Sequence, residues 1–243
     1  MRYLLACLLV CAQSAVAAVP EPDAATAQPA QVAVLATLHG MHAEVPGYAD
    51  AGLKASILRL APDVLCIEMS AQDHAQRRAG SVKVEYPAVV YPLIDAQQYT
   101  VCTLEPSSPQ AGTIIGPYQA ANRAFHEDRP DEAAAFSAYM DALYAALRRH
   151  WRDPSRVNDA VTDDLMRAKH ALQEAMIGEG ERTGWGAWNQ HFLDVIVRTA
   201  SEHPGKRIVV LVGVEHGYWL RDRLAGRDDI ELLDTAALLM GDG

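Results

Sequence analysis

Basic residues are scarce in this chain relative to acidic ones. The 243 residues include 21 lysines and arginines against 31 aspartates and glutamates, and the formal net charge is −10. An acidic protein is a poor match for nucleic acid or for anionic lipid surfaces, so we expect neither as a partner. Long apolar runs are also absent after the first ten residues, which excludes a later membrane span.

The one long apolar run has the pattern of an export signal. Arg2 supplies a small positive region, Tyr3 to Val10 are almost wholly apolar, and Ala15-Val16-Ala17 is a cleavage signal. We predict a signal peptide over residues 1–18, a disordered lead-in over residues 19–30, and an exported protein that is periplasmic or secreted. An uncut membrane anchor is the alternative. Without residues 1–18 the chain loses Arg2 and becomes one unit more negative.

Cysteines are few, and two of the four lie in the predicted signal peptide. Cys66 and Cys102 remain, each inside an apolar run that is typical of a strand. A disulfide between neighbouring strands is one possibility in an oxidising compartment. We favour two free buried thiols that act as small apolar side chains. Neither a disulfide framework nor a cysteine zinc site is indicated.

Several common catalytic motifs are missing. The chain has no G-x-S-x-G elbow, no phosphate-binding P-loop, no glycine-rich dinucleotide motif after a strand and no H-E-x-x-H. The sequence therefore does not point to a serine hydrolase, a nucleotide enzyme or a zinc protease of the H-E-x-x-H type.

The apolar patterns that are present predict an α/β fold with a central, mostly parallel sheet flanked by helices. Five runs rich in Val, Ile and Leu are continuous rather than alternating, which is typical of strands covered on both faces. They are residues 32–37, 64–68, 100–104, 207–213 and 230–233. Residues 31–243 are expected to form a single domain.

Helical spacing of apolar residues predicts the remaining elements. We expect helices over residues 48–60 and 88–97, and an α-helical insertion over about residues 130–180 that packs over one edge of the sheet. The insertion would consist of one helix from about Asp131 and a second over residues 156–177. Gly178, Gly180, Gly184 and Gly186 predict a flexible connection, after which residues 188–202 resume a helix.

Two of the predicted strands end close to a histidine. The run from Val32 leads to His39, and the run from Ile208 leads to His216. Glu68 and Glu105 follow two other strands. The carboxyl ends of parallel strands share one edge, where open α/β sheets place their chemistry, so we expect these four side chains to meet. Imidazole with carboxylate suits a divalent metal centre or a metal-free acid–base pair.

Other polar residues are weaker candidates. Glu85 precedes a predicted helix and is a candidate general base or ligand, although a carboxylate there also complements the helix dipole. Asn189 is a candidate for binding substrate or an oxyanion. We expect His42, Glu105 and Glu215 to contact the site residues and not the substrate or metal. The remaining histidines, His170 among them, are interpreted as surface residues.

These motifs resemble those of the TraB/GumN and Tiki group, within a wider superfamily that includes erythromycin-esterase-like and ChaN-like haem-uptake proteins. The group is marked by two GxxH motifs and a glutamate after the second strand. Gly213-Val214-Glu215-His216 matches one motif fully, Ala36-Thr37-Leu38-His39 matches the other with alanine for glycine, and Glu68 is the glutamate. The group's Arg-Asn pair reads Trp188-Asn189 here.

The resemblance implies a Tiki-like fold with both motifs in one cleft. It also implies a peptidase that depends on manganese or cobalt, with zinc or iron as other possible metals. On this basis we expect an exported metal-dependent hydrolase that acts on a peptide or a small molecule. His39, His216 and Glu68 would hold the metal or activate its water. The alternatives are a non-catalytic protein that binds haem, iron or a peptide in the same cleft, and a family member whose site is vestigial.

Overall fold

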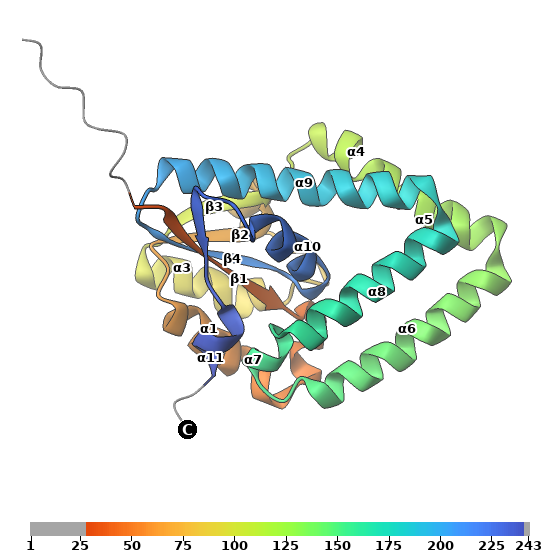
Figure 1. Ribbon diagram of the computed structural model, residues 1–243, viewed down its shortest axis with the longest axis horizontal. Coiled ribbons are helices and arrows are strands. Elements are labelled where there is room, and N and C mark those ends of the chain that lie inside the picture. Colours follow the sequence, from red (N-terminus) through yellow and green to blue (C-terminus); the bar gives the residue numbers. More distant parts are fainter. Residues whose placement is uncertain (1–27, 241–243) are drawn as a thin grey trace, which may run out of the picture.

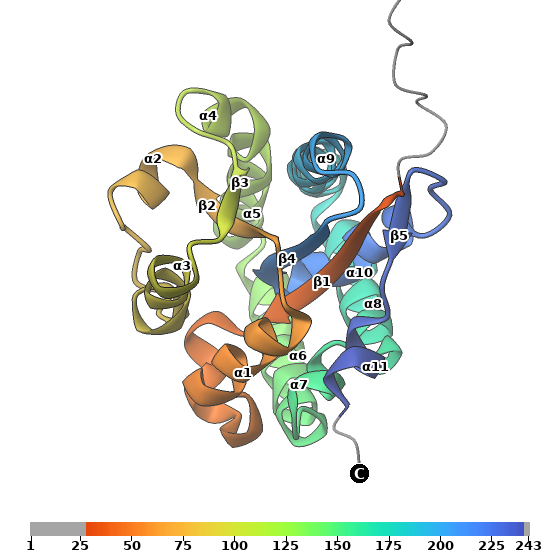
Figure 2. The same cartoon turned by 90° about the vertical axis from the view of Figure 1, so that its left-hand side faces the viewer.

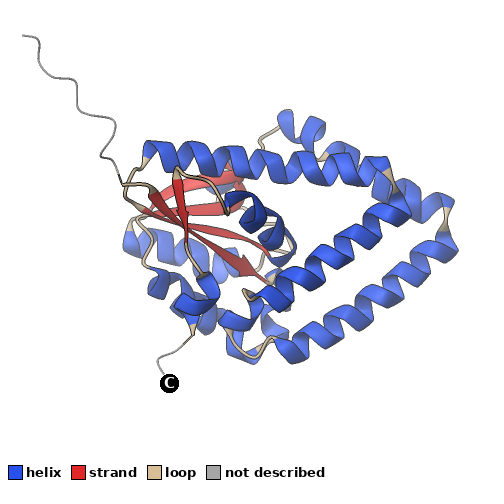
Figure 3. Ribbon diagram, in the orientation of Figure 1, coloured by secondary structure: helices blue, strands red, loops and turns tan. Residues whose placement is uncertain are grey.

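The computed structural model describes residues 28–240, which form an α/β fold around a five-stranded sheet. All strands are parallel, in the order β3-β2-β4-β1-β5. The predicted fold class is therefore confirmed (Figure 3). The strand bounds lie within two residues of those predicted from the apolar runs: β1 Ala30–Thr37, β2 Val64–Ser70, β3 Thr100–Glu105, β4 Arg207–Gly213 and β5 Ile230–Leu232.

Helices cover both faces of the sheet. Helices α9 and α10 pack together on one side, and α1 and α3 lie across the sheet from them (Figure 2). The helices are α1 Asp50–Leu60, α2 Ala71–Ala75, α3 Tyr91–Gln97, α4 Gln110–Ile114, α5 Gly116–Asp128, α6 Pro130–His150, α7 Pro154–Val157, α8 Ala160–Ile177, α9 Glu179–Glu202, α10 Val214–Leu224 and α11 Thr235–Leu239. Short 3-10 helices, η1 His39–Glu44 and η2 Pro46–Tyr48, precede α1, and a π-helical turn, Tyr86–Val90, precedes α3.

Helices α5, α6 and α8 and the first half of α9 form an arm beside the sheet (Figure 1). The carboxyl ends of the strands point toward this arm. The predicted helix over residues 156–177 is interrupted, because the Asp159 carboxylate accepts a hydrogen bond from the backbone N–H of Thr162 at 3.0 Å and begins α8 there.

The glycine-rich segment is not a flexible connection, and this prediction was wrong. Helix α9 runs without a break from Glu179 to Glu202 and contains three of the four glycines. A Cβ added at Gly184 would lie 2.5 Å from the backbone nitrogen of Tyr118, and one added at Gly180 would lie 2.8 Å from the Cβ of Ala121. Glycine is needed here for the close approach of α5 and α9, not for flexibility.

Cys66 and Cys102 form a disulfide, so our preference for free thiols was wrong. They are register partners on β2 and β3, with their Cα atoms 4.3 Å apart. Direct opposition on neighbouring strands brings the two thiols within bonding reach. The apolar pattern around each cysteine carries no information about this register.

Some expectations lie partly or wholly outside the described residues. The predicted signal peptide and most of the lead-in fall in residues 1–27, although Ala30 already belongs to β1. Between residues 28 and 240, no helix combines the length and apolar character that crossing a bilayer requires.

Replacing both cysteines with serine should lower the free energy of unfolding by about 4 kcal/mol. The disulfide closes a loop with a sequence separation of 36 residues, and removing it restores conformational entropy to the unfolded chain. Urea unfolding of the oxidised protein and of the double variant measures the difference. Equal stabilities, or free thiols at both Cys66 and Cys102 in the unreduced denatured protein, would contradict the assignment.

Candidate active site

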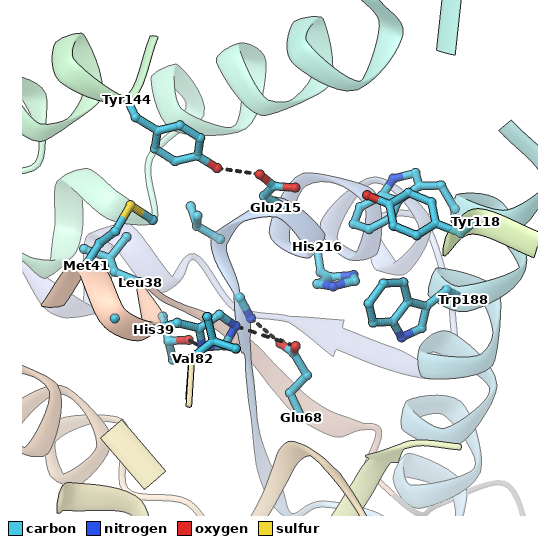
Figure 4. A pocket seen from close by; sticks show the side chains of 15 residues that line it. Leu38, His39, Met41, Glu68, Val82, Tyr118, Tyr144, Trp188, Glu215 and His216 are labelled. Atoms are coloured by element: carbon cyan, nitrogen blue, oxygen red, sulfur yellow. Dashed lines mark hydrogen bonds and ion pairs between the residues drawn. The ribbon is translucent and has the colours of Figure 1, made fainter. Parts of the chain in front are cut away.

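A cavity of about 420 Å³ lies where the carboxyl ends of the strands face the helical arm (Figure 4). Its floor comes from the ends of β1, β2 and β4, and its walls are mostly apolar and aromatic. The lining residues are Thr37, Leu38, His39, Gly40, Met41, Glu68, Val82, Tyr118, Tyr144, Trp185, Trp188, Gly213, Val214, Glu215 and His216.

The sheet order explains how distant residues meet here. Strand β4 lies between β1 and β2, so His39 after β1, Glu68 on β2 and His216 after β4 come from three adjacent strands. Thr37 and Gly213 are register partners, which places the ends of the two histidine motifs side by side. The structure thus brings His39, Glu68 and His216 to one cavity, and in Figure 4 the Glu68 carboxylate lies between the two imidazoles.

Glu68 occupies an irregular part of β2. The register between β2 and β3 shifts between Ile67 and Ser70, and such bulges re-aim side chains near active sites. The backbone groups of Glu68 are satisfied from outside the sheet, since its N–H donates to the hydroxyl of Tyr86 at 2.8 Å and its carbonyl accepts from the Lys83 ammonium. The carboxylate can therefore point into the cavity while its backbone remains fully bonded.

The Glu68 carboxylate is held as an anion. It accepts a hydrogen bond from the backbone N–H of Gly213 and forms an ion pair with Lys83 at 2.9 Å. Burial disfavours its charge, but Lys83 and His39 outweigh this cost and hold the pKa of Glu68 well below its usual range.

Gly213 is the glycine of the second motif, and it is required by the histidine of the first. A Cβ at this position would lie 2.7 Å from Nε2 of His39 and 3.4 Å from Oε2 of Glu68. Any larger residue would have to displace the imidazole or the carboxylate. The same glycine therefore allows close packing of the site and donates the backbone N–H that Glu68 accepts.

His39 lies between two carboxylates. Its backbone has a φ of 48°, an uncommon conformation for a residue other than glycine that is often found at functional sites. Nδ1–H donates to Oε1 of Glu85 at 2.7 Å, and Nε2 lies 3.6 Å from Oε1 of Glu68. Burial alone would lower the pKa of His39, but the two carboxylates raise it to about 10, so the imidazole is protonated at neutral pH.

Glu85 is fully buried behind His39 and does not line the cavity. Its contacts with His39 and with the hydroxyl of Thr37 suit a residue that orients the imidazole. This position gives no support to the expected role as a general base that contacts substrate.

His216 is buried among aromatic rings. Its ring stacks on Trp185 with centroids 4.6 Å apart, and Trp188 and Phe192 pack against it. Burial lowers the pKa of His216 to about 4, so this imidazole is neutral at neutral pH. The two histidines of the cavity therefore carry different charges.

Asn189 determines which nitrogen of His216 holds the proton. The amide Nδ2 of Asn189 donates to the carbonyl of Trp185 at 2.9 Å, which leaves its Oδ1 as an acceptor for Nδ1 of His216 at 2.8 Å. Nδ1 must then carry the proton, and Nε2 has a free lone pair. Asn189 is buried away from the cavity, so its contacts suit a positioning role and not the expected binding of substrate.

Lys83 was missed by the sequence analysis. Its ammonium bridges Glu68 at 2.9 Å and Glu105 at 3.3 Å, and these carboxylates raise its pKa against the effect of burial. Burial raises the pKa of Glu105 to about 7, partly offset by Lys83. Glu105 also accepts a hydrogen bond from Nε1 of Trp188. The sequence offered one indication of this role, since Lys83 stands between two valines and two residues before Glu85.

His42 and Glu215 support the site from outside its centre. His42 accepts the backbone N–H of Leu38 through Nε2 and donates through Nδ1 to the carbonyl of Tyr48, which holds the loop that carries His39. Glu215 accepts from the hydroxyl of Tyr144 and forms an ion pair with Lys169, and its Oε2 lies 3.4 Å from Nε2 of His170. It links α10 to the helical arm.

His170 is not a surface residue as expected. It is buried and stacks on Trp185 with centroids 4.1 Å apart, on the helical arm. Its neighbours Lys169 and Gln173 are also buried, so α8 presents a polar stripe to the interior. Helical spacing of polar residues does not reveal burial when the partners come from other helices.

The donor groups do not fit a divalent metal as they are arranged. Within residues 28–240, no three His, Cys, Asp or Glu side chains converge as the ligands of one ion would. Both Glu68 oxygens already have partners, Gly213 and Lys83, and the Lys83 ammonium supplies the positive charge that a metal would bring. Nδ1 of His39 donates to Glu85, and its Nε2 faces the Glu68 carboxylate at 3.6 Å. The metal centre stays a prediction that these contacts do not favour.

Comparison of the chain with protein-family models, with curated proteins and with solved structures found no match. The resemblance to the TraB/GumN and Tiki group therefore stays a prediction from the motifs.

The charge on His39 should make stability depend on pH. Its pKa in the folded protein, about 10, exceeds the ordinary value of 6.5, so the stabilisation is complete below pH 6.5 and is lost as the pH rises through 10. The free energy of unfolding of the wild type should exceed that of His39→Gln at pH 6 by a few kcal/mol, since one pKa unit corresponds to about 1.4 kcal/mol.

Urea unfolding of both proteins from pH 6 to pH 10.5 measures this effect. The difference between them should shrink steadily above pH 7. A difference that stays constant over this range would show that His39 is not charged in the folded protein.

Proposed function

We propose that this protein is a hydrolase in which His216 activates water and the protonated His39 stabilises the charge that forms on the substrate. One observation carries the proposal: two imidazoles line a single cavity with Glu68 between them, and carboxylates that raise the pKa surround His39 whereas burial among aromatic rings lowers the pKa of His216. Titratable groups whose surroundings push their pKa values apart are typical of an acid–base pair in catalysis.

The geometry supports a simple sequence of proton transfers. Nε2 of His216 accepts a proton from water, and the resulting hydroxide attacks the carbonyl carbon of the substrate. The carbonyl oxygen becomes negative next to the His39 imidazolium, which Glu68 and Glu85 hold in place. When the tetrahedral intermediate collapses, His216 returns the proton to the leaving group. The products are an acid and an amine or alcohol, and both histidines regain their starting states.

The chain's own residues keep each histidine in its state. Glu68 and Glu85 stabilise the charge of His39, and Lys83 keeps Glu68 anionic. Asn189 leaves the lone pair of His216 on Nε2, and burial among aromatic rings keeps this imidazole neutral. We propose a peptide bond as the scissile bond, because the motif resemblance implies a peptidase.

Non-catalytic binding is the second candidate. A free imidazole nitrogen among aromatic side chains, as His216 presents it, also suits an iron porphyrin or the apolar part of a peptide. Titration with haemin separates the two: tight binding with no hydrolysis of any substrate would favour the binding protein.

We also propose that the protein is exported. The Cys66–Cys102 disulfide supports this, because disulfides form and persist mainly in oxidising compartments outside the cytosol.

Cleavage should have a broad pH optimum. We expect kcat/KM to fall below about pH 4, where His216 becomes protonated, and above about pH 10, where His39 loses its charge. A mixed peptide library, analysed by mass spectrometry, identifies a substrate, and its hydrolysis is then followed from pH 3 to pH 10.5.

His39→Gln and His216→Gln should each lower kcat/KM by roughly 10²–10⁴-fold. His126→Gln, a substitution of an exposed histidine in α5, is the matched control and should leave kcat/KM unchanged. Full activity in either site variant would contradict the assigned roles.

Removing metals should not affect the reaction. Lys83 already neutralises Glu68, so the proposed steps need no divalent ion. The test is dialysis against a chelator, followed by addition of manganese, cobalt or zinc. A rate that disappears on dialysis and returns with one metal would replace our mechanism with the metal-dependent one that the motifs imply.

A further inference from the structure

A second cavity, of about 640 Å³, lies on the other side of Glu68. Glu68 and Trp188 line both cavities, so the two spaces meet at the proposed catalytic centre. The second cavity extends along the ends of β2 and β3 toward α2, α4 and the start of α5.

Three polar contacts mark the junction. The Lys83 ammonium lies between Glu68 and Glu105, and Nε1 of Trp188 donates to Glu105 at 3.0 Å. Trp188 also packs edge-on against the ring of His216. The junction is therefore ordered by ion pairs and a hydrogen bond, directly beside the two imidazoles.

The two cavities differ in chemistry. The first is walled largely by Leu38, Met41, Val82, Tyr118 and Trp185. Val82 is 65% exposed although it lines this cavity, so an apolar group entering there would remove it from water.

The second cavity offers donors and acceptors of both signs. An Asp73–Arg78 ion pair lies on its wall, together with Gln72, Gln119 and Lys83. Such a mixture suits the N–H and C=O groups of an extended backbone.

We propose that the substrate is a peptide that spans both cavities, with one large apolar or aromatic side chain in the first and a polar stretch in the second. The inference rests on the proposed function, because it places the scissile bond at the junction beside Glu68, His39 and His216. It adds a preference for particular side chains of the peptide, which the catalytic groups alone do not determine.

Binding of small probes tests the first cavity. N-Acetylphenylalaninamide should bind the wild-type protein at least tenfold more tightly than N-acetylglycinamide, because only the first buries an aromatic ring. Calorimetry measures both, with mass spectrometry to monitor hydrolysis. Val82→Ser should weaken the binding of the phenylalanine probe roughly three- to tenfold. Val84→Ser, on the same loop but outside the cavity and 45% exposed, is the control and should have no effect.

Extension of the probe tests the second cavity. Two probes, Ac-Phe-Ser-Gln-NH2 and Ac-Ser-Gln-Phe-NH2, cover both chain directions, and one of them should bind more tightly than N-acetylphenylalaninamide. Ala111→Trp places a large side chain in the second cavity. It should remove the gain in affinity from extension without changing the affinity for N-acetylphenylalaninamide. Gly112→Trp is the control, since Gly112 does not line the cavity and a Cβ there meets nothing within 4 Å.

The outcomes separate this inference from the proposed function. Peptide cleavage with no preference between phenylalanine and glycine, or no gain from extension in either direction, would overturn the two-cavity substrate and leave the hydrolase in place. The expected binding pattern without cleavage of any peptide would support the two-cavity site and contradict the hydrolase.

Discussion

The site depends on the contact between Gly213 and the pair formed by His39 and Glu68. The end of β4 lies between the ends of β1 and β2, and only a residue without a side chain leaves room there for an imidazole and a carboxylate. The backbone N–H of Gly213 also binds the carboxylate that keeps His39 charged. One position thus couples the packing of three strands to the electrostatics of the cavity.

The two histidines differ in protonation state because their surroundings differ. His39 lies between carboxylates and is protonated, whereas His216 lies among aromatic rings and is neutral. Lys83 completes the arrangement, because a buried carboxylate such as Glu68 would otherwise be too costly to keep ionised. The lining of the cavity therefore combines a cation and a free lone pair, the two kinds of group that the proposed hydrolysis uses to stabilise an oxyanion and to activate water.

The sequence predicted the framework well and the contacts between elements less well. Continuous runs of Val, Ile and Leu identified all five strands of the described sheet, because burial on both faces leaves a strong local pattern. The glycines of α9 were misread as a flexible connection, since their reason, the close approach of α5, lies in another helix. The Cys66–Cys102 disulfide and the burial of Lys83 and His170 depend in the same way on partners remote in the chain.

The residues alone were enough to place His39, Glu68 and His216 at the ends of parallel strands, because continuous apolar runs separated by helical segments indicate parallel strands covered on both faces. Their charges were not accessible at that level. The pKa of a histidine depends on its surroundings, and here the two carboxylates and the aromatic rings come from three segments of the chain other than those that carry the histidines. Only the folded molecule brings those segments together, so only tertiary structure decided which imidazole is positively charged.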